Sequence, residues 1–120
     1  MTTLDPNTRQ VTPKGTGADI AQLVSIDLNS VVLPAEVESH VLSSVYERLL
    51  YFAAYLRNRL TGDGIDRGLV ALDIEARARK GEAKYGERLR AFNGRDASLD
   101  LYQEITDSVM YLRQIIEEDR

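Results

Sequence analysis

The chain has 120 residues, a net charge of −4, no cysteine and one histidine. This length suits one domain with a single core, and the acidic balance gives no field that would attract nucleic acid or anionic lipid, so neither is expected as a partner. Without Cys, disulfide frameworks, zinc fingers and thiol nucleophiles are excluded, and any metal would be a hard cation on oxygen ligands.

Residues 1–17 are rich in Thr, Pro, Gly and Asn and have almost no large apolar side chain. Such a segment cannot offset the entropy of ordering itself, which predicts a flexible N-terminal arm ahead of one helical domain at 18–120. The arm has no apolar signal region, and no run of about 18 apolar residues follows anywhere in the chain. These two observations favour a cytoplasmic protein without a membrane segment.

Residues 18–34 are apolar again and are expected to dock as a short helix or a strand-like arm. Pro34 then predicts the start of a long helix over 35–60, since proline is favoured in a first helical turn. Apolar residues recur there at three- and four-residue steps and cover more than one stripe. The sequence TGDG at 61–64 predicts its end, because glycine is the preferred C-terminal cap.

The helix expected at 65–84 has apolar ridges on two nearly opposite sides. A helix of this kind packs on both faces. One bundle of this size can hardly supply neighbours for so many ridges, so a homo-oligomer of undetermined size is the economical interpretation.

The last helix is expected over 98–118, with Ser98 or Asp96 as its N-cap. Its apolar stripe runs from Leu101 to Ile116 in helical spacing. No segment alternates strongly enough for a sheet. The fold class predicted is therefore all-α, a helical bundle of three main helices with an extended N-terminal arm, oligomerising through two-faced helices.

Three acids of this last helix, Asp100, Glu104 and Asp107, form one line with Tyr111, roughly 150° from the centre of the apolar stripe. A charged line opposite a core is ordinarily a solvated face. Glu104 and Asp107, however, repel each other at i, i+3 without a lysine on that face to pair them. A shared divalent cation such as Mg²⁺ would remove the repulsion, which makes this line a candidate metal site.

Cations gather just before the acids: Lys80, Lys84, Arg88, Arg90 and Arg95. Guanidinium and ammonium groups beside carboxylates are what a phosphate with Mg²⁺ requires, although they can equally pair with Glu82, Glu87 and Asp96 at the surface. Aromatic side chains nearby could stack on a base. The candidate nucleotide- and phosphate-binding residues are Lys80, Lys84, Tyr85, Arg88, Asn93, Arg95 and Tyr111.

The string QEITDSVMYL, an E-x-x-D on a helix followed by an apolar run, resembles the second metal motif of the MazG-like all-α nucleoside triphosphate pyrophosphohydrolases. Residues 73–117, with ARKGEAKYGERL, NGRD and D-x-Y-Q-E-x-x-D, also resemble a group of small, often MazG-like proteins of tailed phages. The resemblance implies an oligomeric helical bundle in which acids from two helices hold Mg²⁺ around nucleotide phosphates. In place of the family's E-x-x-E on the preceding helix, this chain has Glu75 and Glu82, about 10 Å apart along the axis.

Three functions remain open at this stage. The first is a Mg²⁺-dependent NTP pyrophosphohydrolase, with Glu104 and Asp107 as catalytic metal ligands and Asp100, Glu75 and Glu82 as further candidates. The second is a non-catalytic, phage-type binder that sequesters a nucleotide signal, which the departure from E-x-x-E favours. The third is a structural or adaptor oligomer whose acids are only solvated.

Overall fold

The computed structural model describes residue 6 and residues 10–11, 13–36 and 40–120. Over these residues the structure is all-helical: α1 (Ile20–Ser30), α2 (Val41–Thr61), α3 (Arg67–Tyr85) and α4 (Ala97–Glu118). The all-α class is confirmed for these residues, and a fourth, short helix, α1, lies where a short helix or a strand-like arm was expected. None of these helices has the length and apolar character needed to cross a membrane.

Aspartates start three of the four helices. Asp19, Asp66 and Asp96 each accept hydrogen bonds from backbone N–H groups in the first turn of α1, α3 and α4. These N–H groups have no partner within the helix, so an aspartate cap stabilises the helix start. Of the two N-caps considered for the last helix, Asp96 is the one observed.

Glycines end the two middle helices. Gly62 follows α2 at φ 75°, and Gly86 follows α3 at φ 86°. Only glycine adopts this left-handed backbone without steric cost, and each glycine N–H returns to a carbonyl of the last turn. The helix end expected from TGDG is confirmed, and α3 ends at Tyr85, one residue beyond the range expected for it.

The expected start of α2 was wrong. Pro34 is not in the first turn of a helix, because Ala35 and Glu36 are non-helical and α2 begins at Val41. Part of the intervening chain, 37–39, lies outside the described residues, and so does most of the predicted arm at 1–17. Where the structure describes that arm, at residues 6, 10–11 and 13–17, the backbone is neither helix nor strand.

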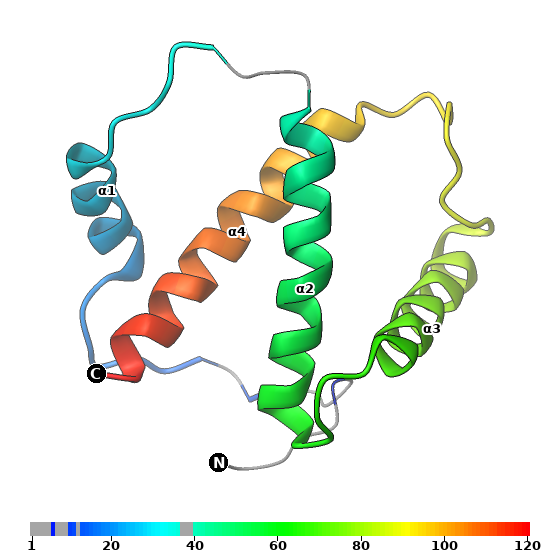
Figure 1. Ribbon diagram of the computed structural model, residues 1–120, viewed down its shortest axis with the longest axis horizontal. Helices are drawn as coiled ribbons and strands as arrows, with labels where there is room; N and C mark the ends of the chain where they lie inside the picture. The colour runs from blue at the N-terminus through cyan, green and yellow to red at the C-terminus, as the bar shows by residue number, and fades with distance from the viewer. Residues whose placement is uncertain (1–5, 7–9, 12, 37–39) are drawn as a thin grey trace. The chain divides into compact units, whose positions relative to one another are not determined.

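The chain divides into two compact units, each built on one helix pair (Figure 1). The α2–α3 unit comprises Met1–Val11 and Glu36–Asn93, and the α1–α4 unit comprises Thr12–Ala35 and Gly94–Arg120. A pair of helices can bury only the side along which its members touch. Accordingly, no described side chain is fully buried, and many large apolar side chains are exposed.

In each helix pair, one arginine forms an ion pair between the two helices. In the α2–α3 unit, Arg57 Nε donates to Asp73 at 2.6 Å, and a second nitrogen donates to Asp63 at 3.2 Å. In the α1–α4 unit, Arg113 Nε donates to Asp27 at 2.8 Å. Both arginine side chains are largely covered, at 15% and 13% exposure, so their alkyl stems also contribute to the contact between the helices.

Candidate functional site

The acidic line lies on one helix, as its spacing predicts. Asp100, Glu104 and Asp107 are all in α4, and Tyr111 continues the line one turn further on. Asp100 is half-buried, whereas the other three residues are exposed. The helical spacing puts the acids on one side of α4, where they are open to a ligand from solvent.

Asp100 is not free to bind a metal in this structure. Arg95 Nε and Nη2 donate to its two carboxylate oxygens at 3.0 and 2.8 Å. This bidentate geometry makes a strong ion pair. The hydrogen bonds from Arg95 lower the pKa of Asp100 below its ordinary value. The first acid of the line is thus neutralised by a cation that was itself a candidate phosphate ligand.

Glu104 and Asp107 are in a different position. Within the part of the chain that the structure describes, neither carboxylate makes an ion pair or accepts a side-chain hydrogen bond. The backbone carbonyl of Glu104 accepts a hydrogen bond from Ser108 Oγ at 2.8 Å. Two like charges one helical turn apart are mutually unfavourable.

Glu75 of α3 is held more tightly than any other candidate ligand. Arg88 Nη1 and Nη2 each donate to one of its carboxylate oxygens at 2.9 Å, and Arg79 Nε donates at 3.3 Å. The hydrogen bonds from Arg88 lower the pKa of Glu75, and Glu75 in turn raises the pKa of Arg88. Arg88 thereby folds the start of the loop after Gly86 back onto α3.

Arg88 and Arg95 form ion pairs with acids other than those expected from the sequence under the alternative that these arginines only make surface ion pairs. That interpretation assigned them to Glu82, Glu87 and Asp96, whereas Arg88 binds Glu75 and Arg95 binds Asp100. Asp96 is used as a helix cap. The negative charge of Glu82 also raises the pKa of the Arg88 guanidinium.

The remaining candidates are exposed. Lys84 Nζ lies 5.1 Å from the centre of the Tyr85 ring, a cation–π distance, and Tyr85 is 73% exposed. Lys80 lies one turn earlier on α3. Asn93 is in the loop before α4. This loop also holds Phe92 at φ 57°, a left-handed conformation that is uncommon for an aromatic residue.

The candidate residues belong to both units. The α2–α3 unit holds Glu75, Lys80, Glu82, Lys84, Tyr85, Arg88 and Asn93. The α1–α4 unit holds Arg95, Asp100, Glu104, Asp107 and Tyr111. Among the described residues, no group of three or more His, Asp or Glu side chains lies close enough together to hold a metal ion. A cation bound at Glu104 and Asp107 would therefore have these two residues as its protein ligands.

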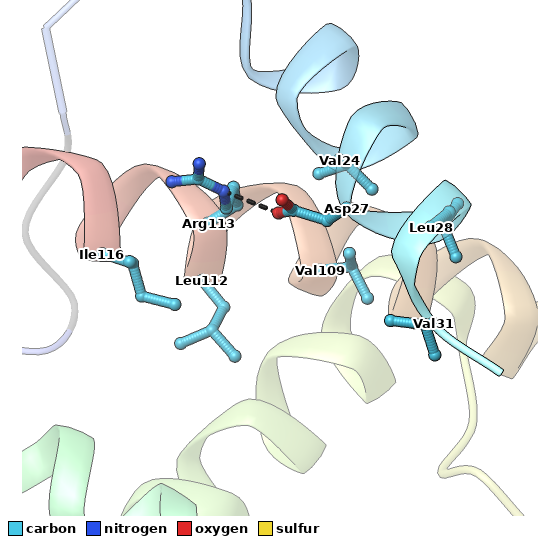
Figure 2. Close-up of a pocket in the computed structure, with 8 residues that line it drawn as sticks. All are labelled: Val24, Asp27, Leu28, Val31, Val109, Leu112, Arg113 and Ile116. Atoms are coloured by element: carbon cyan, nitrogen blue, oxygen red, sulfur yellow. Dashed lines mark hydrogen bonds and ion pairs between the residues drawn. The ribbon is translucent and has the colours of Figure 1, made fainter.

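An apolar cavity between α1 and α4 was missed in the sequence. Its lining is Val24, Asp27, Leu28, Val31, Val109, Leu112, Arg113 and Ile116, and its volume is about 230 Å³ (Figure 2). The apolar character of 18–34 showed that this segment would dock. The helix on which it docks could not be read from spacing, because Asp27 and Arg113 are 86 residues apart.

The candidate residues include carboxylate, ammonium and guanidinium groups. Exposed, unpaired carboxylates bind Mg²⁺, and planar guanidiniums recognise phosphate. Both kinds of group are present, although two of the arginines are paired with acids of the chain. In comparisons with family models, with curated proteins and with solved structures, none matches this chain.

Proposed function

We propose that this is a MazG-like, Mg²⁺-dependent nucleotide-binding protein and that it acts as a nucleoside triphosphate pyrophosphohydrolase. One observation carries the proposal: Glu104 and Asp107 are unpaired on one turn of α4 over the described residues, while Asp100 and Glu75 are neutralised by arginines. A like-charged pair left without a partner is stabilised by a shared cation, and carboxylates are ligands that Mg²⁺ accepts.

Each group has a role in this proposal. Glu104 and Asp107 would hold Mg²⁺, which would supply charge neutralisation of the phosphates and activation of water. Tyr111, which continues the acidic line on α4, would stack on the base. In the reaction, the oxygen of water bonds to the α-phosphorus, the bond from that phosphorus to the α,β-bridging oxygen breaks, and pyrophosphate leaves with the nucleoside monophosphate as the other product.

A second candidate is a binder that leaves the nucleotide intact. The pairing of Glu75 with Arg88 and Arg79 favours it, because a carboxylate held by three guanidinium hydrogen bonds is withdrawn from a second metal-ligand set. In such a protein, Glu104 and Asp107 would hold Mg²⁺ beside the phosphates without turnover. Both candidates require a nucleotide-containing compartment, which accords with a proposed cytoplasmic location.

Ligand-dependent melting and product analysis separate the two candidates. The protein is heated with a panel of nucleoside triphosphates and cyclic nucleotides, with Mg²⁺ or with EDTA, and the products are separated. Mg²⁺-dependent release of pyrophosphate identifies the hydrolase. A raised melting temperature with the nucleotide recovered intact identifies the binder. If no nucleotide shifts the melting temperature, the proposal is rejected and the alternative of a structural or adaptor oligomer is favoured.

The variant Glu104→Gln tests the metal ligands directly. Without Mg²⁺ it should melt about 1–2 °C higher than the wild type, because a like-charge repulsion worth roughly 0.3 kcal/mol is removed. With Mg²⁺ and nucleotide it should lose the ligand-induced shift and any turnover. Glu118→Gln, the same change near the end of the same helix, is the matched control and should keep both. Full turnover in Glu104→Gln would reject Glu104 as a ligand.

A further inference from the structure

Asn93 and Gly94 lie in the loop between α3 and α4. Neither residue is helical, and both are exposed. Asn93 is the last residue of the α2–α3 unit and Gly94 is the first residue of the following segment of the α1–α4 unit. A chemical change at the peptide bond between them would therefore alter a covalent connection between the two units.

The backbone on either side of Asn93 is irregular. Phe92 has φ 57° and Gly94 has φ 86°, so left-handed residues precede and follow the asparagine. A left-handed backbone favours glycine, which accounts for the glycine at this position. A Cβ added at Gly94 would meet no neighbouring group within 4 Å, so the space around this residue is open.

An asparagine followed by glycine can react with its own backbone. The nitrogen of the glycine attacks the Cγ atom of the asparagine, and a succinimide ring closes as the N–Cγ bond forms. The Cγ–Nδ2 bond breaks, the proton of the glycine N–H passes to the departing nitrogen, and ammonia leaves. Water then opens the ring at one of its two carbonyls, which gives aspartate or isoaspartate. The reaction consumes one water and needs no enzyme, oxidant or metal.

The glycine nitrogen must be accessible for this ring to close. Over the part of the chain that the structure describes, the N–H of Gly94 makes no hydrogen bond. Asn29 and Asn58, by contrast, lie within α1 and α2. A helix fixes the backbone and bonds each interior N–H to the carbonyl one turn earlier, which holds the nitrogen away from the side chain. Asn7 lies outside the described residues.

The pair Asp63–Gly64 is the instructive contrast. Gly64 has φ 83°, and a Cβ added there would also meet no group within 4 Å, so its backbone is as open as that of Gly94. Its N–H, however, donates to Asn58 Oδ1 at 2.7 Å. The two glycines thus differ in whether the nitrogen is hydrogen-bonded, while their steric surroundings are alike.

We propose that Asn93 deamidates spontaneously in the folded protein, through the succinimide formed with Gly94, to aspartate and isoaspartate. The change adds one negative charge to a chain whose net charge is −4. The isoaspartate form also adds one methylene group to the backbone between α3 and α4. The inference is independent of the proposed function, because the reaction requires no bound metal or nucleotide.

Peptide mapping of the incubated protein tests this modification. The full chain carrying Asp63→Asn has a second Asn–Gly pair at 63–64, and trypsin releases the two pairs in the separate peptides 60–67 and 91–95. In the folded variant, the pair at 93–94 should deamidate at least about tenfold faster, because the Gly64 nitrogen is released only when its turn opens locally. In urea, the two pairs should react at similar rates, since neither nitrogen is then protected.

The wild type and Asn93→Gln complete the test. Glutamine would have to close a six-membered ring, which forms far more slowly, so this variant should not accumulate the acidic form that the wild type acquires. Circular dichroism checks that both variants keep the wild-type helical content. Equal rates at the two pairs in the folded Asp63→Asn variant would overturn the proposal. So would a wild-type peptide 91–95 that stays unmodified in the folded protein while it reacts in urea.

Discussion

At the scale of single residues, arginine–carboxylate pairs separate the acids of this protein into two classes. Asp100 and Glu75 are each bound by two nitrogens of one guanidinium, whereas Glu104 and Asp107 are not paired within the described residues. The four acids look alike in the sequence. Their partners divide them into structural carboxylates and carboxylates available to a ligand.

The Glu75–Arg88 pair predicts how stability depends on pH. The pKa of Glu75 is lowered in the folded protein, so its contribution to the free energy of unfolding is complete above its unfolded pKa of about 4.3 and is lost as the pH falls through the folded pKa. Wild-type melting temperature should therefore fall between about pH 5 and pH 3, and Glu75→Gln should show a shallower fall over that window.

Thermal melts at several pH values measure this difference. Glu82→Gln is the control, because it removes a carboxylate of the same helix that has no ion pair within the described residues. It should keep the wild-type pH dependence. Parallel curves for Glu75→Gln and the wild type would show that the pair contributes nothing to stability.

At the scale of helices, alanine substitutions at Gly81 and Gly86 are predicted to change the stability of the protein in opposite directions. Gly81 lies inside the helix, where an added Cβ would meet no neighbouring group within 4 Å, so Gly81→Ala should stabilise by about 0.5–1 kcal/mol. Gly86 caps the helix at φ 86°, where a side chain strains the backbone, so Gly86→Ala should destabilise by about 1 kcal/mol. Urea unfolding measures both changes. Effects of the same sign would mean that Gly86 does not end α3 in this conformation.

The helix ends were largely predictable because they depend on local chemistry. Glycine after Thr61 and after Tyr85, and aspartate before α4, act within one turn of the backbone. The start of α2 was not predictable from Pro34, because proline is equally suited to the extended chain that precedes a helix. Periodicity thus located the helices better than it located their first residues.

At the scale of the whole molecule, the exposed apolar surface predicts that stability depends on protein concentration. If the chain forms the homo-oligomer that its two-faced helices predict, folding is linked to association, and the melting temperature should rise with concentration by mass action. Differential scanning calorimetry at concentrations spanning about a hundredfold measures this rise. Leu112→Asp, on the apolar stripe of α4, should abolish the rise, and Leu89→Asp, at an exposed position in the loop after α3, should retain it. A melting temperature independent of concentration in the wild type would contradict the predicted homo-oligomer.

The sequence by itself determined the helical class, the positions of the three longer helices and the alignment of Asp100, Glu104 and Asp107 on one side of α4. All of these follow from interactions within a few residues of the chain. Only the tertiary structure decided that α1 packs on α4, that Arg57 joins α2 to α3, and that Glu75 and Asp100 are held by arginines. Contacts between distant segments depend on which surfaces meet, and the spacing of residues along one helix carries no information about its neighbour.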